Sequence, residues 1–169
     1  MSAGVQVRDV VPDDLAAISA IYNHYVRESV VTFDEEEGTP EDWAVKHAGL
    51  GEAGLPFLVA ADAVSGRVLG YALVQPWRVK SAYRFTVEDS IYLSADAAGR
   101  GIGRVLLGAL LEACAAAGLR QVIAVITAGG AEASIALHRR LGFVETGRLH
   151  DVGVKFGRPL GTVLLQKSL

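Results

Sequence analysis

The sequence is poor in cysteine and in runs of basic residues. Its single cysteine, Cys114, cannot form a disulfide within the chain, so the composition fits a reducing compartment. Cys114 lies in the apolar stretch LLEACAAAGL, which indicates a small buried side chain rather than a nucleophile. The net charge is −3 and no long run of lysine or arginine occurs, and both features disfavour nucleic-acid binding.

Signals for membranes, secretion and metals are also missing. No apolar run reaches the ~20 residues that cross a bilayer. The N-terminal region carries Arg8, Asp9, Asp13 and Asp14 without an apolar core between them, which differs from a signal peptide. The four histidines have no metal-ligand spacing. We therefore expect a cytoplasmic protein without a membrane partner and without a metal.

The length and composition are those of an ordinary globular protein. The chain has 169 residues, of which 51% are hydrophobic and 21% are charged. This length corresponds to one domain that is large enough to bury a core. We expect a single domain over residues 1–169.

The first half of the chain predicts strands and two helices. Pro12 with two following acids opens one helix, and Thr39-Pro40-Glu41-Asp42 opens another, because Thr is a good N-cap and Pro fits the first helical position. The turn Ser65-Gly66 between two apolar runs predicts a hairpin. The expected elements are a strand at 5–10, a helix from 12 to about 27, a helix from 40 to about 50, and strands at 56–62, 67–75 and 83–93.

The second half alternates helices and strands and then ends in two strands. A helix follows the glycines near residue 100 and stops at Gly118, and a shorter helix stops at Gly142. The nearly uninterrupted apolar run at 120–127 predicts a strand that is covered on both faces. Two strands flank a turn at 156–159. The element order predicts an α/β (α+β) fold with a mixed sheet rather than a strictly alternating Rossmann pattern.

The segment AGRGIGRVLL at 98–107 is a glycine turn between a strand and a helix. A helix start presents free backbone N–H groups and the positive end of the helix dipole, which together suit a pyrophosphate. Spacing alone leaves a simple tight loop equally open. A P-loop would need a Lys that is missing, and a dinucleotide fingerprint would need a glycine where Leu106 stands. What remains is a pyrophosphate held mainly by backbone N–H groups, with Arg100 and Arg104 nearby.

The whole pattern resembles a known family. The strand, the AGRGIG turn, the helix, the apolar strand and the helix ending in LHRRLGF resemble the GCN5-related N-acetyltransferases, or GNAT family. The blocks IYNHYVRESVVTFDEEEGTPEDW, PWRVKSAYRFTVEDSIYLS and GVKFGR resemble its phosphinothricin / methionine sulfoximine acetyltransferase subgroup. The resemblance implies a mixed central sheet of about seven strands flanked by about four helices, with a splay between the two central strands.

The resemblance also implies acetyl-CoA as co-substrate. Its pantetheine arm would pair with an open strand edge, and a backbone N–H near Leu93 would polarise the thioester carbonyl. Ser134 would touch the cofactor from the last helix. The implied cofactor-binding residues are Ile91, Tyr92, Leu93, Gly99, Arg100, Gly101, Ile102, Gly103, Arg104 and Ser134.

Two residues are candidates for proton transfer. Taken alone, Glu88 is a solvated strand carboxylate, but the resemblance puts it at the position of the family's general base, which takes the amine proton directly or through a water. His138 lies where a thiolate-side general acid is expected, and an imidazole exchanges protons near neutral pH. A packed or surface helix histidine is the competing interpretation of His138.

The acceptor and the assembly also follow from the resemblance. The loop 78–83 would cap an amino-acid-like substrate, with a cation binding its carboxylate or its phosphinate or sulfone oxygen, and Phe33 packing on the aliphatic part. The implied substrate-binding residues are Phe33, Arg78, Lys80, Ser81, Ala82 and Tyr83. The expected substrates are phosphinothricin, methionine sulfoximine and methionine sulfone, and the expected assembly is a homodimer.

The chain departs from the subgroup at several positions. Ala98 stands where the glycine turn usually begins with Gln or Arg, and the loop AGGAEAS at 128–134 is one residue longer and lacks an Asn. Pro159 and Gly161 replace an expected tryptophan and an expected acid. Two alternatives stay open: acetylation of another small amine or a protein N-terminus, and a non-catalytic acetyl-CoA-binding module.

Overall fold

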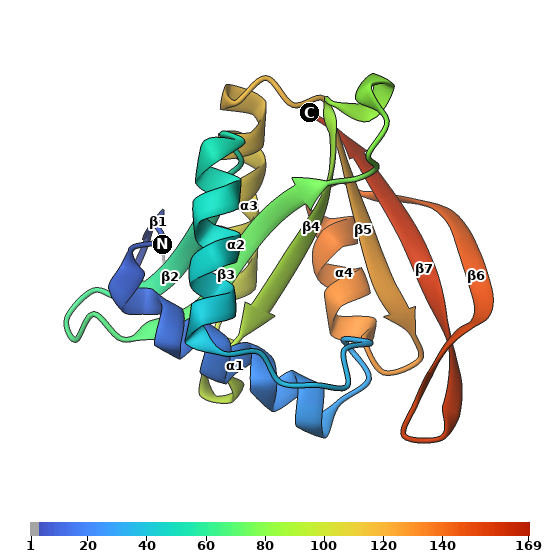
Figure 1. Cartoon of the computed structure of the whole chain (residues 1–169), viewed down its shortest axis with the longest axis horizontal. Coiled ribbons are helices and arrows are strands. Elements are labelled where there is room, and N and C mark those ends of the chain that lie inside the picture. Colours follow the sequence, from blue (N-terminus) through green and yellow to red (C-terminus); the bar gives the residue numbers. More distant parts are fainter. Residues whose placement is uncertain (1–3) are drawn as a thin grey trace.

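One mixed sheet organises the protein, in a computed structural model that describes residues 4–169. The strand order is β1-β2-β3-β4-β5-β7-β6, with β4 and β5 parallel and the other neighbours antiparallel. Figure 1 shows the sheet running across the molecule, with its long β6–β7 hairpin at one edge. The strands are β1 (Val5–Asp9), β2 (Phe57–Asp62), β3 (Val68–Pro76), β4 (Thr86–Leu93), β5 (Gln121–Ala128), β6 (Val144–Lys155) and β7 (Arg158–Ser168).

Two helices lie on each face of the sheet. The helices are α1 (Leu15–Glu28), α2 (Pro40–Glu52), α3 (Ile102–Ala116) and α4 (Glu132–Arg140). Strand alternation divides the core between the faces: Phe57 and Val59 of β2 pack with α1 and α2, whereas Leu58 and Ala60 pack with α3. Both faces of β2 and β3 are therefore buried.

The predicted helix start at Thr39 is present as a capping box. The backbone N–H of Asp42 donates to Thr39 Oγ1 at 3.2 Å, and the N–H of Thr39 donates to Asp42 Oδ2 at 2.8 Å. Pro40 is the first helical residue, where its missing N–H costs nothing. This start fixes where the loop between α1 and α2 ends.

The splay between the central strands is the feature that positions the site. β4 pairs with β5 through Thr86–Glu88 and Gln121–Ile123, and beyond these residues the two strands separate. Figure 1 shows the β4 and β5 arrows diverging, with α4 seen between them. The expected fold class, with seven strands, four helices and a splay at the centre, is confirmed.

Two details of the expected elements are wrong. The strand predicted to begin at residue 83 begins at Thr86, because Ser81–Tyr83 form a 3₁₀ turn. The strand predicted to be covered on both faces is covered on one: Val122 and Ala124 of β5 are buried, but Val125 is 36% exposed. Hydrophobicity alone does not distinguish a second covering helix from an open apolar face.

Gly70 on β3 lies directly against Leu93 at the splayed end of β4. A Cβ at Gly70 would lie 2.8 Å from the Tyr92 carbonyl oxygen and 2.5 Å from Leu93 Cδ2. We expect Gly70→Ala to lower the free energy of unfolding by about 1–3 kcal/mol, as overpacking does. Gly108→Ala on α3 is the control, since its Cβ would meet open space, and it should be neutral or stabilising. Urea unfolding of both variants tests this, and equal midpoints would contradict it.

Candidate active site

A cavity of about 810 Å³ opens at the splay between β4 and β5. Its walls come from α1 and the loop that follows, from β4, from the glycine turn before α3, from β5 and from the start of α4. Segments that are far apart in the sequence therefore meet there because the two central strands separate. Its lining includes both the glycine turn and Glu88.

The glycine turn forms an open cradle at one end of this cavity. Gly99 and Gly101 have φ angles of 74° and 76°, which glycine adopts without strain, and nothing lies within 4 Å of a Cβ built on either. Gly101 is the N-cap of α3, so the N–H groups of the first turn have no acceptor within the helix. Arg104 also lines the cavity. This arrangement fits a pyrophosphate.

The edge of β4 beyond Glu88 is the second part of the site. Ile91, Tyr92 and Leu93 lie after the last residue that pairs with β5, and all three line the cavity. The Tyr25 hydroxyl donates to the Leu93 carbonyl oxygen at 2.6 Å and so fixes the end of this strand. An extended chain with amide groups can pair with such an edge, so the edge fits a pantetheine arm.

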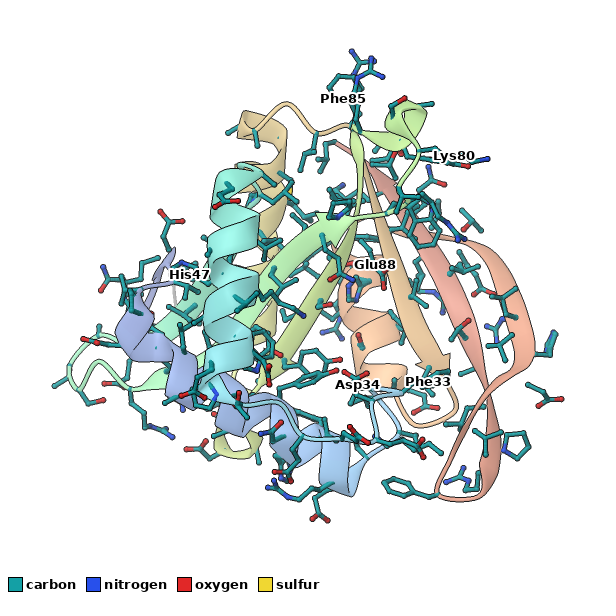
Figure 2. All side chains as sticks on the ribbon, viewed as in Figure 1. Phe33, Asp34, His47, Lys80, Phe85 and Glu88 are labelled. Carbon is teal, nitrogen blue, oxygen red and sulfur yellow. The ribbon has the colours of Figure 1, made fainter. Side chains whose placement is uncertain are left out.

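Glu88 lies on β4 immediately before this open edge. Its side chain is half-buried and lines the cavity, and Figure 2 shows it over the gap between β4 and β5. Burial raises its pKa, and the charge of Asp89 adds to this effect while Arg78 opposes it. Burial also raises the pKa of Tyr92, on the same face, to about 12, so its phenol keeps its proton at neutral pH. Glu88 is therefore the better proton acceptor of the two.

His138 and Asp89 form a buried pair on the opposite face of β4. His138 Nε2 lies 2.8 Å from Asp89 Oδ2, and His138 Nδ1 lies 2.7 Å from the Ser134 carbonyl oxygen. Because a carbonyl accepts and an ionised carboxylate accepts, both ring nitrogens carry a proton in this arrangement. Burial alone lowers the pKa of His138, but the hydrogen bond and charge of Asp89 outweigh it and raise the pKa above 6.5.

The comparisons with known proteins decide the family. The profile of the Acetyltransferase (GNAT) family matches residues 18–143. The chain belongs to this family. GNAT relatives include the phosphinothricin N-acetyltransferase of Alcaligenes faecalis, which is 46% identical over 96% of this chain and 82% of its own length. The L-methionine sulfoximine/L-methionine sulfone acetyltransferase of Pseudomonas aeruginosa is 44% identical over 100% of this chain and 96% of its own length.

A solved GNAT structure has the same fold and carries the cofactor. The phosphinothricin acetyltransferase of Sinorhizobium meliloti, in complex with acetyl-CoA, superposes with a TM-score of 0.92 at 43% identity and covers 98% of this chain and 89% of its own length. The protein is accordingly an acetyl-CoA-dependent N-acetyltransferase. Within residues 4–169, no group of three metal-ligating side chains comes together.

The cavity gathers most of the catalytic and cofactor-binding residues predicted from the sequence. They are Glu88, Ile91, Tyr92, Leu93, Gly99, Gly101, Gly103, Arg104, Ser134 and His138. Arg100 is exposed and Ile102 is 1% exposed within the core, and neither side chain lines the cavity. Their predicted contact with a phosphate would have to come from the backbone.

The predicted substrate residues are divided between two ends of the opening. Phe33 lines the cavity, but Arg78, Lys80, Ser81, Ala82 and Tyr83 do not. Figure 2 shows Phe33 at the lower end of the gap and Lys80 at the upper end, with Glu88 between them. The Arg78 guanidinium lies 4.8 Å above the centre of the Trp77 ring, and its positive charge acts to lower the pKa of Glu88. The roles of the 78–83 loop stay predictions.

Sequence reasoning missed several polar residues of the cavity. Thr32 and Asp34 belong to an acidic connector with no periodic pattern, and their place in the wall depends on contacts with Tyr22 and with the distant strand β6. Asp89 is the neighbour of Glu88 on β4 and faces the other way, and its partner His138 is 49 residues away. Alternation could have marked Asp89 as an inward-facing carboxylate that needs a partner.

The Asp89–His138 pair gives the protein a pH-dependent stability. Because the folded-state pKa of His138 is raised, the stabilisation is full below about pH 6.5 and declines as the pH rises through the raised pKa. We expect Asp89→Asn to cost about 2–3 kcal/mol at pH 6 and distinctly less at pH 9. Thermal unfolding at both pH values measures this, with exposed Asp9→Asn as the control. A Tm difference that is the same at both pH values would contradict the charged pair.

Proposed function

We propose that the protein acetylates the α-amino group of a small amino-acid analogue, with phosphinothricin, methionine sulfoximine and methionine sulfone as substrates. The observation that carries this is the position of Glu88, half-buried in the cavity and immediately before the open edge of β4. A base at this position reaches an amine that approaches a thioester lying along that edge. The GNAT relatives with these activities support the choice of substrate.

The reaction requires an uncharged amine, a polarised carbonyl and a protonated leaving thiol. Glu88 takes a proton from the bound ammonium group, directly or through a water, and its raised pKa brings its basicity closer to neutral pH. A backbone N–H near Leu93 polarises the thioester carbonyl. His138, whose two ring nitrogens are engaged by Asp89 and Ser134, must release one of these contacts to protonate the thiolate.

The acceptor lies on the same face of β4 as Glu88. Strand alternation puts Tyr92 on that face too, where it stacks on Tyr71 below α1 and α2. Phe33, which lines the cavity, supplies an apolar contact at one end. Lys80 lies at the other end of the opening, and the charge of Arg78 acts on Glu88, so this loop supplies positive charge for a carboxylate or phosphinate oxygen. An apolar contact and a positive charge are the two features that an amino-acid analogue with an aliphatic chain and an acidic group requires.

The protein acts in the cytoplasm as a homodimer in this proposal. The face of β5, β7 and β6 on the side away from α3 and α4 carries apolar side chains, among them Ile123, Val125, Leu149 and Leu164. A second copy would remove this surface from water. Within residues 4–169 no helix has the length and hydrophobicity to span a bilayer.

Replacement of the base tests the reaction. We expect Glu88→Gln to lower kcat on methionine sulfone or phosphinothricin by about 100-fold or more, because an amide cannot accept the proton. The wild-type kcat should fall as the pH drops through the raised pKa of Glu88, and the variant should lack this fall. Thiol release from acetyl-CoA measures both effects across an amine panel that includes ordinary amino acids, a polyamine and a peptide.

Binding of acetyl-CoA is the control for the Glu88→Gln variant. Calorimetry should give the variant an affinity for acetyl-CoA close to the wild-type value, since the Glu88 carboxylate faces the acceptor and does not hold the cofactor. Wild-type turnover confined to other amines would refute the substrate class. Equal kcat values and pH profiles for the two proteins would refute the role of Glu88.

The dimer is tested at a residue outside the cavity. Leu149 is 47% exposed on the uncovered sheet face, and we expect Leu149→Asp to convert a dimer to a monomer because it buries a charge in the interface. Val64→Asp, at a 95% exposed position between β2 and β3, is the matched control. Light scattering after gel filtration gives the masses. A monomeric wild type or a dimeric Leu149→Asp protein would contradict this interface.

A further inference from the structure

The loop at residues 29–39 forms a wall of the cavity although it contains no helix or strand. It joins α1 to α2, and its residues Val31, Thr32, Phe33 and Asp34 line the cavity. Figure 2 shows Phe33 and Asp34 below Glu88 at the same opening. An irregular segment keeps one shape only where other parts of the protein hold its backbone, so the contacts of this loop decide the shape of the acceptor side.

Helix α1 contacts the loop near its middle, at residues 32 and 34, and near its end, at residue 38. The Tyr22 hydroxyl lies 2.7 Å from Thr32 Oγ1 and also donates to the Asp34 carboxylate. Asn23 holds the other end, donating to the Gly38 carbonyl oxygen at 2.8 Å and accepting from the Gly38 N–H at 3.0 Å. The Tyr22 contacts use the side chains of Thr32 and Asp34, so the Thr32 carbonyl and the Phe33 ring are held by other partners.

Strand β6 supplies the partners on the other side. Lys155 Nζ donates to the Thr32 carbonyl oxygen at 2.8 Å, across 123 residues of sequence. Two residues earlier on β6, a Cβ at Gly153 would lie 2.5 Å from Phe33 Cε2, so the Phe33 ring rests on the glycine backbone. Residues two apart in a strand share a face. Lys155 and Gly153 therefore lie next to each other on one face of β6, where Lys155 binds Thr32 and Gly153 contacts the Phe33 ring.

Lys155 is an unusual choice for this position. The residue is 1% exposed, and burying an ammonium group is costly. Burial lowers the pKa of Lys155, while the carboxylates of Asp34 and Glu35 act in the opposite direction. A methionine would fill the same space without a charge. The charged group does two things that methionine could not: it donates a hydrogen bond to the Thr32 carbonyl oxygen, and it attracts the carboxylates of Asp34 and Glu35.

We infer that Lys155 is a positioning residue for the acceptor substrate. By holding the Thr32 carbonyl, and with Gly153 seating the Phe33 ring, it fixes the loop wall on the side of β4 to which Glu88 points. It thereby sets the affinity for the amino-acid analogue, while the glycine turn and the β4 edge hold acetyl-CoA independently of it. This inference rests on the proposed function, because it assigns the acceptor to the Glu88 side of the cavity.

The test separates the two substrates. In Lys155→Met we expect the KM for the acceptor to rise roughly tenfold or more, because a displaced wall removes binding made in ground and transition states alike. The KM for acetyl-CoA and the kcat should stay within about twofold of wild type. Lys167→Met, which removes a lysine on β7 outside the cavity lining, is the matched control and should change neither KM.

A second variant reaches the same wall without removing the charge. Gly153→Ala pushes against the Phe33 ring and keeps Lys155, so it should reproduce the rise in acceptor KM with an unchanged KM for acetyl-CoA. Circular dichroism and Tm show whether each variant is folded. An unchanged acceptor KM in a folded Lys155→Met or Gly153→Ala protein would overturn the inference, as would an equal rise in both KM values.

Hydrogen exchange provides a readout that does not require turnover. Amides of residues 30–36 should exchange at least about tenfold faster in Lys155→Met than in wild type, because the loop loses its hold on β6. Unchanged exchange would overturn the positioning role. If the wild type turns over no amino-acid analogue, the proposed function fails, and the exchange result still decides whether Lys155 holds the loop.

Discussion

β4 and β5 hydrogen-bond over Thr86–Glu88 and Gln121–Ile123 and then separate, and the site follows from this separation. Buried or half-buried backbone groups need partners, so the edge of β4 after Glu88 is energetically incomplete until something pairs with it. The same divergence opens the cavity and lets α4 approach β4 from one face and the 29–39 loop from the other. Glu88, the last paired residue, lies where the two strands begin to part.

Two buried charged contacts stabilise the walls of this opening. On one face the Asp89–His138 pair links β4 to α4 across the gap, and on the other Lys155 links β6 to the loop after α1. Each costs desolvation, which a packed apolar contact would avoid. Hydrogen bonds from charged groups fix direction as well as distance, and this matters where an irregular loop and a splayed strand must keep one geometry.

Local chemistry explains what the sequence could predict. Thr39-Pro40 and the glycine turn act through their own backbone, and the structure has a capping box at Thr39 and an N-cap at Gly101. The period of two along β4, which turns Glu88 and Asp89 to opposite faces, also needs no distant contact. Other features depend on distant parts of the chain. The His138–Asp89 pair and the Lys155–Thr32 contact join residues 49 and 123 positions apart, and one face of β5 is exposed because no helix packs on it. No local pattern encodes them, so their discovery required the fold.

Amide hydrogen exchange with and without acetyl-CoA tests most directly whether the splay between β4 and β5 holds the cofactor. We expect slower exchange in two segments on binding, Ile91–Leu93 at the open edge of β4 and Gly99–Arg104 at the start of α3, because the cofactor supplies acceptors for these N–H groups. Saturating acetyl-CoA that leaves both segments unchanged, or protects residues remote from the splay instead, would contradict it.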